Sequence, residues 1–219
     1  MKEIRFSSET FILHPSGLLL WPHQNTAIVA DLHLEKASYY AERGQFLPPH
    51  ETEETLQNLL IDLEFAAMRK VIFLGDSFHD PKGYERLNKT SKKLFDKLCD
   101  HYEILWVEGN HDASFVPPNI KTVYEEHIQN ITLRHIAEND ATLEISGHYH
   151  PKAQIHLKGQ RINRACFIED GNRLILPAYG SLTGGLDIKN KVISELFSKD
   201  FTAHLLGNNK IYSIPSDKF

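Results

Sequence analysis

Carboxylate, imidazole and amide side chains recur in short motifs along this chain. In order, the motifs are Asp31-Leu32-His33, Gly75-Asp76, Gly109-Asn110-His111-Asp112, His135 and Gly147-His148-Tyr149-His150. Oxygen and nitrogen ligands without thiolate suit manganese, iron or zinc. Two adjacent divalent ions can activate a water and hold both the attacking and the leaving oxygens of an in-line displacement. The motifs therefore predict a two-metal centre for phosphoester hydrolysis.

The spacing of the first ligands indicates how they would share ions. Asp31 and His33 are two residues apart, so on an extended segment both side chains would point to the same face and bind one ion. The two carboxylate oxygens of Asp76 can bridge two ions. Asn110 offers a neutral carbonyl oxygen, which adds a ligand without adding charge.

The histidines complete the predicted ligand set. The chain has 13 of them in 219 residues. His148 and His150 repeat the spacing of two, and they can bind both metals together or one each. His135 is the candidate between the third and last motifs, with His127 as a nearby competitor. Each motif alone has a plainer interpretation as a loop cap or turn. Their joint occurrence, in order and after apolar strands, favours a metal site.

The elements that must position these motifs are short apolar strands. Residues 27–30, 71–74 and 104–107 are apolar runs that end at or just before a motif, and helical stripes cover residues 51–68 and 88–98 between them. This alternation is typical of a layered α/β fold, in which sites gather beyond the carboxyl ends of the strands.

The remaining elements are predicted to be short strands. Three of these open the chain, at residues 4–6, 10–13 and 18–21. The second half has little helix, and its predicted strands are residues 131–133, 141–145, 155–157, 164–168, 173–176 and 201–205. We therefore expect a second, largely antiparallel sheet that completes a β-sandwich with helices outside, in a single domain over residues 1–219.

Composition limits the class of protein. With 219 residues, of which 41% are hydrophobic and 24% charged, the chain can bury one sizeable core. The formal net charge of −5 disfavours extensive binding of duplex nucleic acid. Cys99 and Cys166 lie outside every motif and predict neither a disulfide framework nor a zinc knuckle. No apolar run reaches the roughly 18 residues of a membrane span, so we expect no membrane partner and a cytoplasmic location.

The complete motif set, over about residues 27–151, resembles the calcineurin-like metallophosphoesterase family. The resemblance implies an α/β fold with a four-layer α/β/β/α sandwich and a dinuclear centre. One metal would be held by Asp31, His33, Asp76 and His150, and the other by Asp76, Asn110, His135 and His148. His111 resembles the family's non-ligand histidine, which protonates the leaving oxygen or holds the phosphate, and Asp112 would orient it.

Four longer segments indicate which group within this family the chain resembles. Residues 30–36, 75–80, 147–151 and 176–185 together resemble the bacterial DNA ligase-associated metallophosphoesterases. That resemblance implies phosphodiester hydrolysis on cyclic nucleotides or nucleic-acid ends, manganese as the working metal, and a link to a DNA ligase and a helicase in DNA repair. His135 departs from the family pattern because Ile136, and not glycine, follows it. The stretch 177–185 itself is interpreted as plain structure.

Several other residues are candidates for contact with substrate. Asn110 and His111 are expected to bind the phosphate, and His79 and Asp80 lie close in sequence to Asp76. A basic cluster, whose plainer interpretation is a solvated strand face, consists of Arg161, Arg164 and Arg173. The residues that either flank the substrate mouth or pack a helix are Tyr39, Tyr40 and Arg43.

Two other functions compete with a phosphodiesterase. The chain shows no cap domain that would shape a specific pocket, so a phosphomonoesterase or nuclease of broad specificity stays open. A non-catalytic interaction module on the same fold is the alternative from another class. Such modules tend to lose active-site histidines, and this chain has kept its set. The oligomeric state, the physiological substrate and the native metal stay open.

Overall fold

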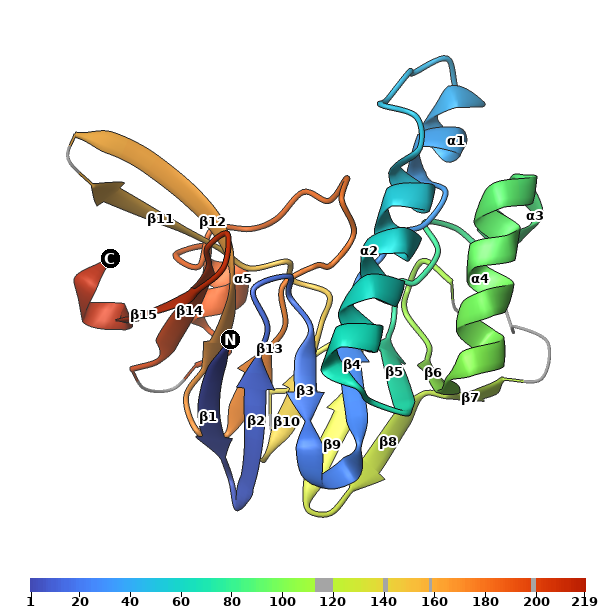
Figure 1. The fold of residues 1–219 in the computed structure, drawn as a ribbon. Helices are drawn as coiled ribbons and strands as arrows, with labels where there is room; N and C mark the ends of the chain where they lie inside the picture. The colour runs from blue at the N-terminus through green and yellow to red at the C-terminus, as the bar shows by residue number, and fades with distance from the viewer. Residues whose placement is uncertain (113–119, 140–141, 158, 198–199) are drawn as a thin grey trace.

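A computed structural model describes residues 1–112, 120–139, 142–157, 159–197 and 200–219. Two β-sheets form its centre (Figure 1). The strands of the seven-stranded first sheet pair in chain order: β1 (Lys2–Phe6), β2 (Glu9–Leu13), β3 (Leu19–Trp21), β4 (Thr26–Val29), β5 (Lys70–Leu74), β6 (Glu103–Val107) and β7 (Lys121–Val123). Strands β1 to β4 pair antiparallel, whereas β4 to β7 pair in parallel.

The second sheet has the strand order β15-β14-β12-β13-β10-β9-β8, and β11 pairs with β12 beside this path. Its strands are β8 (Glu125–Ile128), β9 (Ile131–Arg134), β10 (Glu144–Ser146), β11 (Lys152–Leu157), β12 (Gln160–Glu169), β13 (Arg173–Ile175), β14 (Thr202–Leu206) and β15 (Ile211–Pro215). The prediction of a largely antiparallel sheet misses its centre, because β10 pairs in parallel with both β9 and β13.

Helices cover the outer face of the first sheet (Figure 1). The α-helices are α1 (Lys36–Ala41), α2 (Glu51–Ala66), α3 (Gly83–Arg86), α4 (Lys89–His101) and α5 (Lys191–Ser194), with short 3₁₀ turns at Pro22–Gln24 and Ser216–Lys218. Acidic residues in the first turn of α2 complement its dipole. The Asn88 side chain caps α4 by accepting from the backbone N–H groups of Thr90 and Ser91. None of the helices in the described residues is long and apolar enough to cross a membrane.

The alternation of side chains along the strands builds two cores. On β5, Val71 and Phe73 pack beneath α2 and α4, while Ile72 and Leu74 pack between the sheets. A third cluster, which includes Ile193 of α5, covers the outer face of the second sheet. These layers confirm the predicted four-layer α/β/β/α sandwich, whose fourth layer is thin because α5 has only four residues.

Strands β1 to β6 of the first sheet lie where the apolar runs predict them, within a few residues. Helices α1, α3 and α5 and strands β7, β8 and β15 were not predicted. Strand β8 (Glu125–Ile128) is polar because it is an edge strand, so no apolar run marks it. The predicted strand 141–145 begins outside the described residues, and β10 there covers Glu144–Ser146.

Candidate metal centre

The ligand motifs all follow strands that pair in parallel. Asp31, Asp76 and Asn110 follow β4, β5 and β6 of the first sheet, and His135 and His148 follow β9 and β10 of the second. Parallel neighbours end at the same edge of a sheet, and the two sheets pack face to face through one core. Ligands from both sheets therefore meet at a single place.

The ligand loops have an unusual backbone. Asp31, His33, Asp76, His148 and His150 all have positive φ angles, between 45° and 70°. Such angles are uncommon for residues other than glycine, and the strain they store tends to gather at functional sites. The segment around Asp31 and His33 is therefore not extended as predicted, although both side chains belong to one ligand group.

The first group of ligand atoms comes from Asp31, His33 and His150, and these atoms all lie within 4.8 Å of one another. The Nε2 atoms of His33 and His150 are 3.2 Å apart, and Oδ1 of Asp31 is 3.3 Å from Nε2 of His150. Oδ1 of Asp31 is buried without a hydrogen-bond partner among the described residues. Burial, assisted by the charge of His150, lowers the pKa of His33 to about 2. The neutral ring of His33, the neighbouring nitrogen of His150 and an unsatisfied carboxylate oxygen at such distances fit a cation.

The second group comes from Asp76, His135 and His148. Nδ1 of His135 lies 3.0 Å from the carbonyl oxygen of Leu74, which leaves a lone pair on Nε2 when the ring is neutral. That Nε2 lies 3.0 Å from Oδ1 of Asn110, 3.2 Å from Nδ1 of His148 and 3.3 Å from Oδ2 of Asp76. Four potential metal ligands thus converge on one point, and this donor set fits a second divalent ion.

Asp76 connects the two groups. Its Oδ2 is 3.9 Å from Nε2 of His33 and 3.3 Å from Nε2 of His135. Burial alone would raise the pKa of Asp76, but its hydrogen bonds with His135 and the His111 amide lower that pKa to about 2. Burial would likewise lower the pKa of His135, yet the hydrogen bond to Asp76 and the charge of Asp31 raise it to about 9. The position of Asp76 suits a carboxylate that bridges two ions.

His111 stands beside the two groups and is accessible. Its Nδ1 lies 3.0 Å from the carbonyl oxygen of His79, a natural acceptor for an N–H, and its Nε2 is 4.0 Å from Oδ2 of Asp76. The side chain is 40% exposed, so Nε2 can meet a bound molecule. The backbone N–H of His111 donates to Oδ1 of Asp76 over 2.9 Å.

The carboxylate of Asp112 is buried and accepts hydrogen bonds from backbone N–H groups. Its Oδ2 accepts from the N–H groups of Ser77 and Phe78 at 2.8 and 3.2 Å, and its Oδ1 accepts from that of Gly109 at 3.0 Å. Among the described contacts, none joins this carboxylate to the His111 ring, in contrast to the prediction that Asp112 orients it directly. Asp112 instead ties together the loops that carry Asp76 and His111.

His79 lies at the edge of the first group. Its Nδ1 is 3.4 Å from Nδ1 of His33, and its ring stacks on the ring of His111. Burial, assisted by the charges of His111 and Lys36, lowers the pKa of His79 to about 4. Asp80 points elsewhere, because it forms an ion pair with Arg86 in which Nη1 and Oδ1 are 3.1 Å apart.

The predicted basic cluster is divided by the fold. Arg173 is buried, and its Nε donates to Oε1 of Glu144 over 3.0 Å, so its role is structural. Arg161 and Arg164 are exposed on β12, in a hairpin that extends away from the rest of the second sheet (Figure 1). No hydrogen bond or ion pair between described residues joins either of them to the metal groups, and their contact with substrate stays a prediction.

The competitor histidine lies outside the centre. His127 is on the edge strand β8, where its ring nitrogens lie 3.0 Å from Oε1 of Glu125 and 3.1 Å from Oγ1 of Thr132. Its side chain is 62% exposed. The structure therefore brings His135, and not His127, to the ligand groups.

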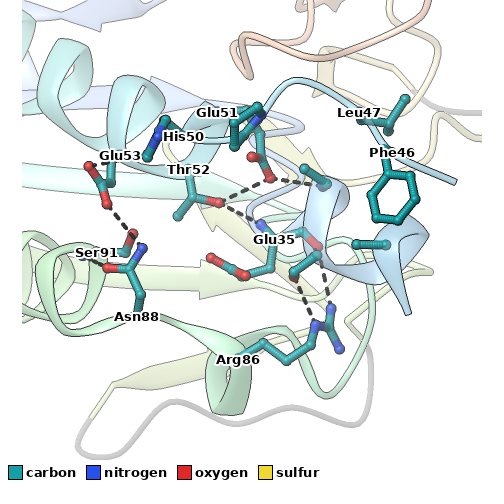
Figure 2. A pocket seen from close by; sticks show the side chains of 14 residues that line it. Glu35, Phe46, Leu47, His50, Glu51, Thr52, Glu53, Arg86, Asn88 and Ser91 are labelled. Atoms are coloured by element: carbon teal, nitrogen blue, oxygen red, sulfur yellow. Dashed lines mark hydrogen bonds and ion pairs between the residues drawn. The ribbon is translucent and has the colours of Figure 1, made fainter. Parts of the chain in front are cut away.

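Residues that sequence analysis missed hold the loop after His33. The N–H of Glu35, which has a left-handed backbone, donates to Oγ1 of Thr52 over 2.7 Å, and the N–H of Ala37 donates to Oε1 of Glu51 over 2.9 Å. Figure 2 shows these bonds at the wall of a pocket of about 520 Å³ between α1, α2 and α4. Acidic and hydroxyl residues at a helix start signal a cap, but no local pattern shows that they serve a distant loop.

The stretch 177–185 braces the same region. The N–H groups of Tyr179 and Gly180 donate to the carbonyl oxygens of Ala30 and Asp31 at 3.0 and 3.2 Å. A Cβ atom on Gly180 would lie 2.1 Å from the carbonyl oxygen of Leu32, so only glycine fits there. The structure thus uses this stretch as support for the first ligand loop.

Comparison with solved structures finds a nuclease of similar fold. The Pseudomonas putida nuclease MPE matches with a TM-score of 0.75 and 25% identity, covering 97% of this chain and 99% of that chain. The Escherichia coli phosphoesterase Yfce matches over 86% of this chain and 97% of its own, with 12% identity and a TM-score of 0.42. No protein-family model and no curated protein matches the sequence. The likeness to the nuclease confirms the predicted resemblance to calcineurin-like metallophosphoesterases.

Proposed function

We propose that this chain, a calcineurin-like metallophosphoesterase by fold, is a phosphodiesterase that uses two divalent ions, with manganese as the working metal. Its substrates are cyclic nucleotides or nucleic-acid phosphodiesters. The observation that carries this proposal is the pair of ligand groups connected by Asp76, with the accessible ring of His111 beside them. A nuclease of similar fold over 97% of the chain supports a phosphodiester substrate.

The ligands divide between the two ions. Asp31, His33 and His150 would hold one ion, and Asn110, His135 and His148 the other, with Asp76 shared. When bound, two such ions neutralise charge on the phosphate and make water a stronger nucleophile. The chain's own task is to hold the ring nitrogens in the required tautomer, as the carbonyl of Leu74 does for His135.

His111 would supply the proton for the leaving oxygen. Because Nδ1 faces the carbonyl of His79, the neutral ring carries its proton there, and donation from Nε2 requires the doubly protonated ring. Asn110 and His79 would contact the phosphate group, and Asp112 would position His111 through the backbone.

The test is the substitution His111→Ala, assayed on bis-p-nitrophenyl phosphate with manganese. We expect kcat to fall by about 10²-fold or more, as for loss of a general acid, while two metal ions per chain stay bound. His127→Ala is the matched control, because that ring lies away from the centre. Full activity of His111→Ala with both metals bound would contradict the assigned role.

A broad nuclease is the second candidate, favoured by the fold of the Pseudomonas nuclease. Rates on phosphomonoesters, cyclic nucleotides and single-stranded or duplex DNA would separate the two. A protein that binds neither metal nor any of these substrates would instead be an interaction module. The links to a DNA ligase, a helicase and DNA repair, the cytoplasmic location and the contacts of Arg161 and Arg164 stay predictions.

A further inference from the structure

Helix α1 places two aromatic rings beside the candidate metal centre. The centroids of the Tyr39 and Tyr40 rings are 5.3 Å apart, and they lie 4.8 and 5.5 Å from the centroid of His79. His79 in turn stacks on His111 at 5.2 Å with an angle of 21° between the planes. A continuous group of rings therefore runs from His111 to the exposed side of α1.

Core packing does not explain these tyrosines. Within α1 only Ala37 is buried, and both tyrosine side chains are partly exposed. Neither ring belongs to the hydrophobic clusters of the described residues. The rings are held at the surface by each other and by His79, so part of their area is open to another planar group.

Side chains of neighbouring elements hold the start of α1 by hydrogen bonds. Besides the bonds from Thr52 and Glu51, Nε of Arg86 donates to Oγ of Ser38 over 2.9 Å (Figure 2). These contacts tie the first residues of the helix to α2 and α3. Rings that are ordered in advance lose little entropy when a ligand stacks on them.

Positive charge accompanies the rings. The guanidinium carbon of Arg43 lies 3.5 Å from the centroid of the Tyr39 ring, and Nη1 donates to the carbonyl oxygen of Tyr39 over 2.7 Å. The Arg43 side chain is 50% exposed. In a chain with a net charge of −5, a cation beside exposed aromatic rings next to a phosphoester site suits a nucleotide, which presents a flat base and an anion together.

On the basis of the phosphodiesterase function proposed above, we propose that Tyr39 and Tyr40 form a stacking site for a nucleobase adjoining the cleaved phosphate, and that Arg43 binds a neighbouring phosphate. Stacking of a base on aromatic side chains contributes about 1–3 kcal/mol. Substrates with a base should therefore be preferred over equally charged esters without one.

Binding tests this proposal without depending on hydrolysis. Calorimetry on the manganese-loaded protein would compare thymidine 5′-monophosphate with methyl phosphate. The double variant Tyr39→Leu/Tyr40→Leu should weaken thymidine monophosphate binding about 5- to 100-fold and leave methyl phosphate unchanged. The conservative Tyr39→Phe/Tyr40→Phe variant should bind like the wild type.

Tyr212→Leu on β15 is the matched control, since its side chain is exposed on another element. Equal losses for both ligands, or no loss for either, would overturn the stacking site. Thermal melting and the amount of bound metal would show whether the leucine variant still folds. If the leucine variant does not fold, the phenylalanine variant tests the proposal instead, because it must then bind thymidine monophosphate more tightly than methyl phosphate.

Hydrolysis separates this proposal from the proposed function. The substrates are the p-nitrophenyl ester of thymidine 5′-monophosphate and methyl p-nitrophenyl phosphate. A wild-type protein that prefers the base in binding yet hydrolyses neither ester would contradict the phosphodiesterase and keep the stacking site. Hydrolysis of both esters with equal KM, unchanged in the leucine variant, would remove the stacking site and keep the phosphodiesterase.

Discussion

A single ring, that of His135, shows how side chains in this centre are prepared for a metal. The carbonyl of Leu74 takes the proton of Nδ1, and the opposite nitrogen faces Asn110, Asp76 and His148. Without a cation, these groups balance their charges by keeping a proton on His135, which is why its pKa rises to about 9. A metal that binds here must displace that proton.

The two candidate histidines allow a matched test of the ligand assignment. We expect His135→Ala to bind one manganese ion fewer per chain, or to bind the second about 10- to 100-fold more weakly, because a ring nitrogen of the second group is lost. His127→Ala should keep the wild-type stoichiometry. Elemental analysis and titration with manganese would measure both. Loss of metal from His127→Ala alone would reverse the assignment.

At the scale of elements, the ligand loops depend on close backbone approach. A Cβ on Gly75 would lie 2.2 Å from Nδ1 of His135, and one on Gly109 would lie 2.1 Å from the backbone nitrogen of Asp76. Gly75 therefore lets its loop approach His135, which follows β9 of the second sheet. Gly109 lets its loop approach Asp76, which follows the neighbouring strand β5. Helix α1 likewise begins at an uncommon backbone conformation, because its N-cap residue Glu35 has left-handed angles.

Substitution of two glycines with similar backbone angles would separate the cost of backbone strain from the cost of steric crowding. Gly75 has φ +82° and Gly171 has φ +88°, but a Cβ on Gly171 would meet no atom within 4 Å. Gly171→Ala should therefore lower the free energy of unfolding by about 1 kcal/mol, from strain alone. Gly75→Ala should lower it by about 2–4 kcal/mol, since overpacking adds to strain, and should weaken metal binding. Urea denaturation would compare them, and equal losses would exclude crowding at Gly75.

At the scale of the whole molecule, the packing of the two sheets buries two carboxylates beside a histidine, so the negative charge is only partly neutralised. Asp31, Asp76 and His135 are all buried between the ends of the sheets. In the metal-free protein the charged form of His135 is stabilised by folding, because its pKa is raised above the usual value of 6.5 to about 9. Its stabilisation is thus complete below about pH 6.5 and is lost as the pH rises through about 9.

We therefore expect the metal-free protein to lose stability between about pH 6.5 and pH 9. The folded ring of His33, whose pKa is lowered to about 2, is neutral throughout that window. Its unfolded form, with the usual pKa of 6.5, still releases protons up to about pH 7.5, so His33 opposes the loss below that pH and adds no slope above it. Manganese should reverse the trend, because it binds the deprotonated ring. Urea midpoints with chelator or with manganese would measure this, and His135→Asn should lack the slope. A metal-free midpoint that rises with pH would contradict the assignment.

The local sequence determined the parts of this protein whose signals are local. Apolar runs of four residues mark β4, β5 and β6, because buried parallel strands need apolar side chains on both faces. The polar motif after each run marks a ligand loop, and the helical stripe of residues 51–68 marks α2. These signals predict the layered fold and the candidate ligands, since both follow from side-chain type and order.

Only the tertiary structure decided what depends on distant neighbours. The sequence favours His135 as the ligand but leaves His127 as a competitor. Pairing in parallel with β10 brings the end of β9, and hence His135, to the centre. Arg173 resembles a surface cation until the fold places it against buried Glu144. The partners of Asp112, the left-handed ligand turns and the exposed rings of α1 are likewise set by contacts across sheets and layers, which no local pattern records.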